Sequence, residues 1–150
     1  MSDGHSDHFI LFLVADTTYA LPSQDVAHVE MVEKVTRVPN APSFVDGVVF
    51  SRGQVVPAVN LRARFGFDRV PPDVRTRLLV VQSNGRSIGL LADECREFML
   101  IPPTAVHPPG ESLAGISAQY MTGIATIGDR LIVVLNLGEL LNTQEPILAA

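Results

Sequence analysis

Apolar residues fall in short runs of strand length along the chain, and residues that favour turns separate the runs. Val, Ile and Phe dominate these runs, as is typical of half-buried strands. Helical periodicity over long stretches is absent, so the pattern predicts an all-β protein. Pairs of apolar runs flank four turn signals, which predict hairpins at Asp16-Thr17, Arg52-Gly53, Asn84-Gly85 and Gly128-Asp129.

Two short helices are predicted beside this β pattern. One follows Asn60 and ends near Gly66, and the other follows Asn136, close to the C-terminal end of the sequence. Asn is a good N-cap because its side-chain oxygen accepts a hydrogen bond from a free backbone N–H of the first turn. Gly suits the position just after a helix.

The chain carries an internal repeat. Gly47 precedes Asn60 by 13 positions, and Gly123 precedes Asn136 by the same 13 positions. The order of hairpin, strand, second hairpin and Asn-capped turn also recurs. The repeat predicts two related units of about five strands each, arranged as a sandwich or as barrels, and barrel closure would remove exposed strand edges. Chance similarity between valine-rich strands is the alternative.

Composition narrows the possible functions. The 150 residues carry a net charge of −5, which disfavours nucleic acid and anionic membrane surfaces as partners. A single cysteine, Cys95, cannot form an internal disulfide, and we expect it to be a buried apolar residue in a reducing compartment. No run approaches the ~18 apolar residues of a membrane-spanning helix, so we expect a cytoplasmic protein.

Few residues suggest chemistry. Asp93, Glu94 and Glu97 form an acidic cluster that could serve a small hydrolase, although a polar strand end with an Arg96 partner is the simpler interpretation. No catalytic, metal or cofactor site is predicted. Arg52, placed between apolar strands, is either a structural clamp between loops or a contact with a partner, and its rigid fork of donors suits both roles.

The stretch from 38 to 62, VPNAPSFVDGVVFSRGQVVPAVNLR, resembles the central motif of the CheW family of chemotaxis coupling proteins, P-x-x-P-x-a-h-x-G-h-x-x-h-R-G-x-h-h-P-h-h-D-L-R, where h is apolar and a is aromatic. The segments 88–93 and 120–137 fit the same family, and the resemblance extends over residues 9–142.

The resemblance implies a fold of two intertwined SH3-like five-stranded barrels with short helices. The barrels would span roughly 15–70 and 77–142 with exchange of terminal strands, and residues 1–8 and 143–150 would be flexible tails. It also implies a non-catalytic scaffold without a cofactor. The partners would be the cytoplasmic tip of methyl-accepting receptors and the regulatory domain of a CheA-type histidine kinase, with the protein held at membrane receptor arrays through those partners.

The resemblance also implies site residues. Those expected to contact partners across an apolar groove between the barrels are Val26, His28, Val29, Arg52, Ile88 and Leu90. Those expected to be structural are Gly47, Gly53, Asn60, Gly123 and Asn136. Because Val26 and Val29 are three positions apart, they face one groove only if a bulge or helical turn lies near Ala27-His28.

The sequence departs from the family pattern in three places. His28 stands where a carboxylate is common, Asn60 replaces the usual Asp, and Phe50-Ser51 replaces Asn-Leu. Two alternatives to a chemotaxis coupling protein stay open: a detached regulatory domain of a larger kinase or receiver-containing protein, and a coupling protein of a pili or other non-flagellar pathway.

Overall fold

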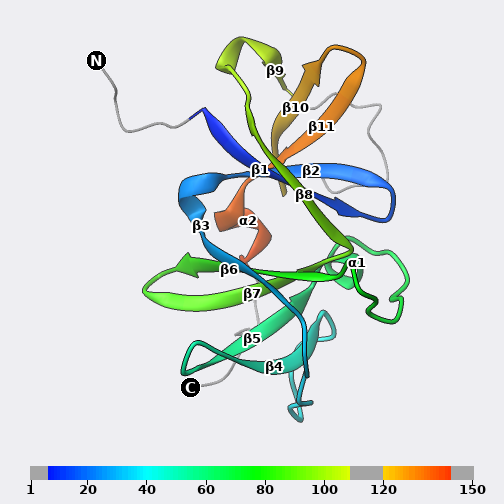
Figure 1. Cartoon of the computed structure of the whole chain (residues 1–150), viewed down its shortest axis with the longest axis vertical. Coiled ribbons are helices and arrows are strands. Elements are labelled where there is room, and N and C mark those ends of the chain that lie inside the picture. The colour runs from blue at the N-terminus through cyan, green and yellow to red at the C-terminus, as the bar shows by residue number, and fades with distance from the viewer. Residues whose placement is uncertain (1–6, 109–119, 143–150) are drawn as a thin grey trace.

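The computed structural model describes residues 7–108 and 120–142, and these residues form two β-sheets with short helical turns (Figure 1). The N-terminal tail prediction falls mostly, and the C-terminal one wholly, outside the described residues. The first sheet has the strand order β8-β1-β2-β11-β10-β9, with bounds β1 His8–Val14, β2 Thr17–Pro22, β8 Glu94–Leu100, β9 Val106–His107, β10 Met121–Ile127 and β11 Arg130–Leu135.

The second sheet has the order β3-β6-β7-β5-β4. Its bounds are β3 Val26–Met31, β4 Val45–Ser51, β5 Gln54–Asn60, β6 Arg77–Ser83 and β7 Arg86–Ala92. The helical elements described are η1 Ser23–Asp25, α1 Leu61–Arg64, η2 Pro103–Ala105 and α2 Leu137–Leu140. The all-β class with short helices is therefore confirmed. Within the described residues, no helix is long and apolar enough to cross a membrane.

The two halves of the chain exchange hairpins. The β1–β2 hairpin pairs with β8 and, in parallel, with β11, both of which come from the second half of the sequence. The β6–β7 hairpin pairs with β3 and, in parallel, with β5, both from the first half. Figure 1 shows the result: β8 crosses from the lower sheet to the upper one, and the two sheets are linked through the middle of the molecule.

Three apolar clusters follow from this arrangement. One fills the first sheet around Leu11 and Ile132, and another fills the second sheet around Leu78 and Val80. The largest, called here the inter-sheet core, joins both sheets and includes Phe12. Strands β1 and β6 contribute to a sheet core from one face and to the inter-sheet core from the other. This double burial explains why their sequences are continuous apolar runs rather than alternating ones.

Gly47 and Gly123 occupy equivalent positions, as the repeat predicted. Each lies at a shift in the register of its hairpin. A Cβ atom at Gly47 would lie 2.1 Å from the carbonyl oxygen of Thr36, and one at Gly123 would lie 2.5 Å from that of His107. A neighbouring segment therefore approaches both glycines too closely for any side chain.

The two Asn caps are equivalent as well. The side chain of Asn60 accepts from the backbone N–H of Ala63, and that of Asn136 accepts from Glu139, each at the third helical position. Their own backbone N–H groups donate to the carbonyl oxygens of Phe44 and Tyr120, at 2.7 and 2.8 Å. The predicted helical turns at both places are thus confirmed.

Candidate partner-binding surface

Strand β3 contains a bulge that brings two apolar side chains to one face. Val26 pairs with Val81 and Val29 pairs with Leu79, with a register shift between Val26 and His28. An extra residue in one strand reverses the alternation of side chains from that point on. Both valines consequently lie half-buried against the inter-sheet core, and the predicted bulge is confirmed.

The other face of β3 carries a polar cluster. Glu30 Oε2 accepts a 2.6 Å hydrogen bond from the Ser51 hydroxyl and lies 2.7 Å from His28 Nε2, which is also 3.3 Å from Ser51 Oγ. These three residues connect β3 and β4, the two edge strands of the second sheet. The same imidazole nitrogen meets both partners, whereas a Ser-His-acid triad uses the two ring nitrogens separately. The cluster is therefore arranged to close the sheet, and His28 points away from the two valines.

Arg52 lies at the tip of the β4–β5 hairpin. Arg52 and Gly53 both have positive φ, +49° and +81°, as a type I′ turn requires. Arg52 is exposed, and within residues 7–108 and 120–142 its side chain has no hydrogen-bond or ion-pair partner. Within these described residues, Arg52 therefore does not form the predicted clamp between two loops. Phe50 and Val55, paired across the hairpin, are also exposed, at 75% and 61%.

Ile88 and Leu90, which the resemblance assigned to the partner surface, are too buried to contact a partner directly. Ile88 is 7% exposed and Leu90 is fully buried, both within the inter-sheet core. Strand β7 lies between β6 and β5, and the face that carries Ile88 and Leu90 is covered by the inter-sheet core, to which the first sheet contributes. In this conformation the two residues support the surface from beneath instead of forming it.

The repeat identifies surface residues that the motif comparison missed. Glu97 pairs with Leu11 in the first sheet as His28 pairs with Val80 in the second, so equivalent positions differ by 69 (97 − 28 and 80 − 11). Strand β8 has the same bulge as β3. Shifted by 69, the pair Val26 and Val29 becomes Cys95 and Phe98. Cys95 packs against the inter-sheet core, and Phe98 is 70% exposed beside Ile10.

Each carboxylate of the acidic cluster has an arginine partner. The shortest N–O distances are 2.7 Å for Asp93 to Arg62, 3.5 Å for Glu94 to Arg96, and 3.1 Å for Glu97 to Arg130. Asp93 also accepts a hydrogen bond from the backbone N–H of Ala15, which fixes the turn between β1 and β2. The three carboxylates are thus spread over separate ion pairs. Within the described part of the chain, no His, Cys, Asp and Glu side chains gather into a possible metal site.

Cys95 is less buried than the sequence predicted. It lies in β8, partly buried, with its Sγ 3.8 Å from the carbonyl oxygen of Leu11. Burial raises the pKa of the thiol, which leaves less of the reactive thiolate at neutral pH.

The structure explains the departure at Asn60. Its amide nitrogen donates a 2.9 Å hydrogen bond to Asp46 Oδ2, while its amide oxygen caps α1. An Asp at this position would place a second carboxylate beside Asp46. Asn therefore keeps the helix cap and also satisfies the neighbouring acid.

Comparisons with known proteins agree with this architecture. The family model described as the CheW-like domain matches residues 8–145. The chain is 34% identical over 133 residues to the chemotaxis protein CheW of Helicobacter pylori, covering 89% of this chain and 80% of the relative. It is 26% identical over 137 residues to the chemotaxis protein CheW of Klebsiella aerogenes, covering 91% and 82%.

Among solved structures, the scaffolding protein CheW of Thermoanaerobacter tengcongensis superposes with a TM-score of 0.84 at 26% identity, covering 96% of this chain and 94% of that one. The family model spans nearly the whole sequence, and the fold agrees along the same length. The chain therefore belongs to the CheW family of chemotaxis adaptor proteins.

Proposed function

We propose that this protein is a non-catalytic scaffold that couples methyl-accepting chemoreceptors to a CheA-type histidine kinase in the cytoplasm. The observation that carries the proposal is a set of apolar side chains on the bulged edge strands of both sheets. Val26 and Val29 on β3 pack against the inter-sheet core, and the exposed Phe98 on β8 pairs with Ile10, a member of that core. Family membership supports the coupling role, since its named relatives are chemotaxis proteins.

The receptor contact is assigned to this bulged surface. A receptor tip is a helical hairpin, and a helix docks on an apolar face through side chains at helical spacing. The bulge gives β3 two valines on one face, and the buried Ile88 and Leu90 belong to the same core cluster beneath that face. Because both valines are already half-buried, covering the rest of one contributes at most about 1.5 kcal/mol of apolar transfer free energy.

A second contact is assigned to the hairpin tip of Arg52, Phe50 and Val55. An exposed guanidinium without a partner in the described chain is ready to receive a carboxylate, and the adjacent apolar pair supplies area that a partner can bury. His28, one of the three departures from the family pattern, is engaged with Glu30 and does not compete for that carboxylate.

The test is kinase activation in a ternary mixture. Autophosphorylation of the cognate kinase would be measured with receptor-bearing membranes, with and without this protein. We expect activity to rise only when all three components are present. We expect Val29→Asp to abolish the rise, because a charge there would be buried without a partner at the interface.

Val74→Asp is the matched control. Val74 is 81% exposed in the loop before β6, so the same substitution there should leave both fold and activation unchanged. Kinase activity that is unaffected by the wild-type protein would contradict the coupling role. Activation by a folded Val29→Asp variant would contradict the assigned surface.

A further inference from the structure

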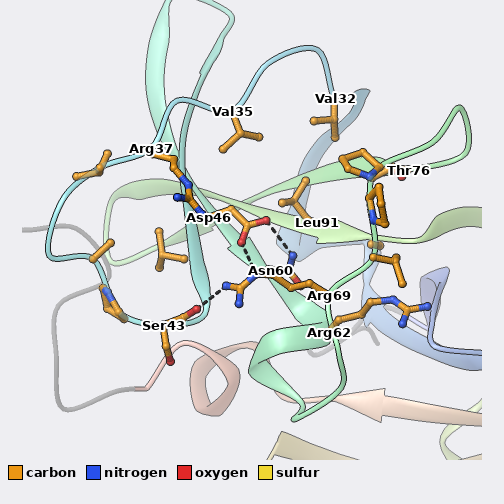
Figure 2. A pocket seen from close by; sticks show the side chains of 18 of the residues that line it. Val32, Val35, Arg37, Ser43, Asp46, Asn60, Arg62, Arg69, Thr76 and Leu91 are labelled. Atoms are coloured by element: carbon orange, nitrogen blue, oxygen red, sulfur yellow. Dashed lines mark hydrogen bonds and ion pairs between the residues drawn. The ribbon is translucent and has the colours of Figure 1, made fainter.

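A pocket of about 1020 Å³ lies beside the second sheet, away from the bulged strands. Figure 2 shows this open pocket bordered by two proline-containing loops, 32–44 and 69–76, and by the start of β4, with Leu91 and Asn60 at its base. None of the residues proposed to contact partners lines it. A volume of this size is at the upper end of the range typical of sites for small molecules.

Among the residues that the structure describes, three arginines and two aspartates line the pocket, and four of these five side chains are already paired. Arg62 donates three hydrogen bonds to Asp93, and Arg69 donates to Asp46 at 2.8 Å and to the carbonyl oxygen of Ser43. Within each ion pair the arginine and the aspartate neutralise one another's charge, and the two pairs fix the positions of the pocket walls.

Arg37 is the exception. Within residues 7–108 and 120–142 it has no hydrogen-bond or ion-pair partner, and Figure 2 shows its guanidinium turned toward the interior of the pocket. The backbone of Thr36 and Arg37 passes directly over Gly47, where a Cβ atom would lie 3.0 Å from the Arg37 Cα. The close approach at this glycine fixes where Arg37 enters the pocket.

Apolar side chains supply much of the remaining lining, beside the polar residues Asn40, Ser43, Asn60 and Thr76. Val35 and Val38 come from one loop, Val70 from the other, and Leu91 from the end of β7. Val35 and Leu91 also pack against the core of the second sheet, which gives this side of the pocket a firm base.

We propose that this pocket binds a small organic monocarboxylate with an apolar body. The carboxylate pairs with Arg37, whose planar fork matches two carboxylate oxygens. The apolar body lies against the valines and Leu91. Among the described residues that line the pocket, Arg37 is the one cation without a partner, so the pocket accommodates one negative charge. A dianion would face Asp46 and Asp93 with its second charge uncompensated.

The test uses N-acetyl-leucine as a defined probe, titrated into the full chain at low salt and followed by backbone amide NMR shifts. We expect saturable shifts at Arg37, Val38 and Leu91. N-acetyl-leucinamide, which lacks the charge, and acetate, which lacks the apolar body, should each bind at least tenfold more weakly.

Two variants make the assignment specific. Arg37→Gln should weaken binding of N-acetyl-leucine at least tenfold. Lys34→Gln removes the same charge from the same loop but from a residue that does not line the pocket, and it should leave binding unchanged. Both positions are exposed, so both variants should melt as the wild type does. The proposal is overturned if the probe shows no saturable binding, if its amide binds equally well, or if Arg37→Gln and Lys34→Gln have equal effects.

Discussion

The two sheets are built from the same parts, yet they close in different ways. In the second sheet, His28 and Glu30 on one edge strand meet Ser51 on the other through hydrogen bonds. The positions equivalent to Glu30 and Ser51 in the first sheet are Met99 and Ile127, and both pack against that sheet's apolar core. The residues at these equivalent positions are polar in the second sheet and apolar in the first, although the strands, bulges and caps around them correspond.

The difference teaches which residues the architecture requires. The bulges, the glycines under crossing segments and the Asn caps recur in both halves, because each serves the backbone. Side chains on the edge strands and at the hairpin tips differ between the halves. Val29 corresponds to Phe98, and Arg52 corresponds to Gly128. We infer that the repeated residues maintain the fold, and that these differing residues are where contacts with partners are specified.

The largest effect is expected at the crossing glycines. Gly47→Ala should lower the free energy of unfolding by more than about 3 kcal/mol, because its Cβ would collide with the Thr36 carbonyl at a φ of +147°. Gly123→Ala should cost less, about 2 kcal/mol, because its collision with His107 comes without an unfavourable φ. Urea denaturation measures both.

Gly53→Ala is the control for this pair. It has positive φ but open space around its Cβ, and it should cost only about 1 kcal/mol. Equal losses at Gly47 and Gly53 would show that φ alone, rather than the close approach, makes glycine necessary.

The two Asn caps should differ by one hydrogen bond. Asn136→Ala removes a cap and should cost about 1 kcal/mol. Asn60→Ala also removes the bond to Asp46 and should cost about 2 kcal/mol. A double-mutant cycle with Asp46→Ala isolates the additional bond. A coupling of zero would mean that the Asn60–Asp46 contact contributes nothing to stability.

The two bulged strands can be compared through receptor binding. Val29→Asp and Phe98→Asp should each weaken binding to a receptor tip at least tenfold, equivalent to about 1.4 kcal/mol. Since Phe98 is 70% exposed, its variant should stay folded, whereas circular dichroism melting must confirm folding for Val29→Asp. A folded Phe98→Asp variant that binds with wild-type affinity would limit the receptor surface to β3.

Local features of the fold could be predicted from the sequence, whereas long-range ones could not. The turn at Asn84-Gly85 and the caps at Asn60 and Asn136 depend on neighbouring residues, and turn chemistry identifies them. The requirement for a bulge at Ala27-His28 followed from the family resemblance combined with strand geometry. The contact of Glu30 with Ser51 joins β3 and β4, which lie at opposite edges of the second sheet and bring together residues 21 positions apart, and no local pattern encodes it.

The burial of Ile88 and Leu90 could not be predicted from the sequence for a different reason. An apolar run in a strand looks the same whether a partner or another sheet covers it. The covering sheet comes from the exchanged hairpin, and that exchange is decided by the packing of the whole chain.

The smallest effect is expected at Tyr19, which corresponds to Ile88 in the other hairpin. Tyr19 is fully buried and stacks on Phe65 with ring centroids 4.9 Å apart, and its hydroxyl has no hydrogen-bond partner of normal geometry among the described residues. Burial raises the pKa of Tyr19 to about 12, and the nearby Thr17 side chain offsets this only in part. The hydroxyl therefore loses its hydration on folding without gaining a good partner.

Tyr19→Phe should consequently change stability by less than about 1 kcal/mol at neutral pH, in the stabilising direction. The difference in stability between the wild type and Tyr19→Phe should increase at alkaline pH. A pKa raised in the folded state stabilises the protein below the unfolded value of 10.0, and that stability is lost as the pH rises toward 12. Wild type should lose about 1.4 kcal/mol per pH unit in this window relative to Tyr19→Phe, because unfolding releases one proton that the variant lacks. Urea midpoints of both proteins at pH 8, 10 and 11.5 measure the difference, and parallel pH profiles would show that the hydroxyl is solvated in the folded protein after all.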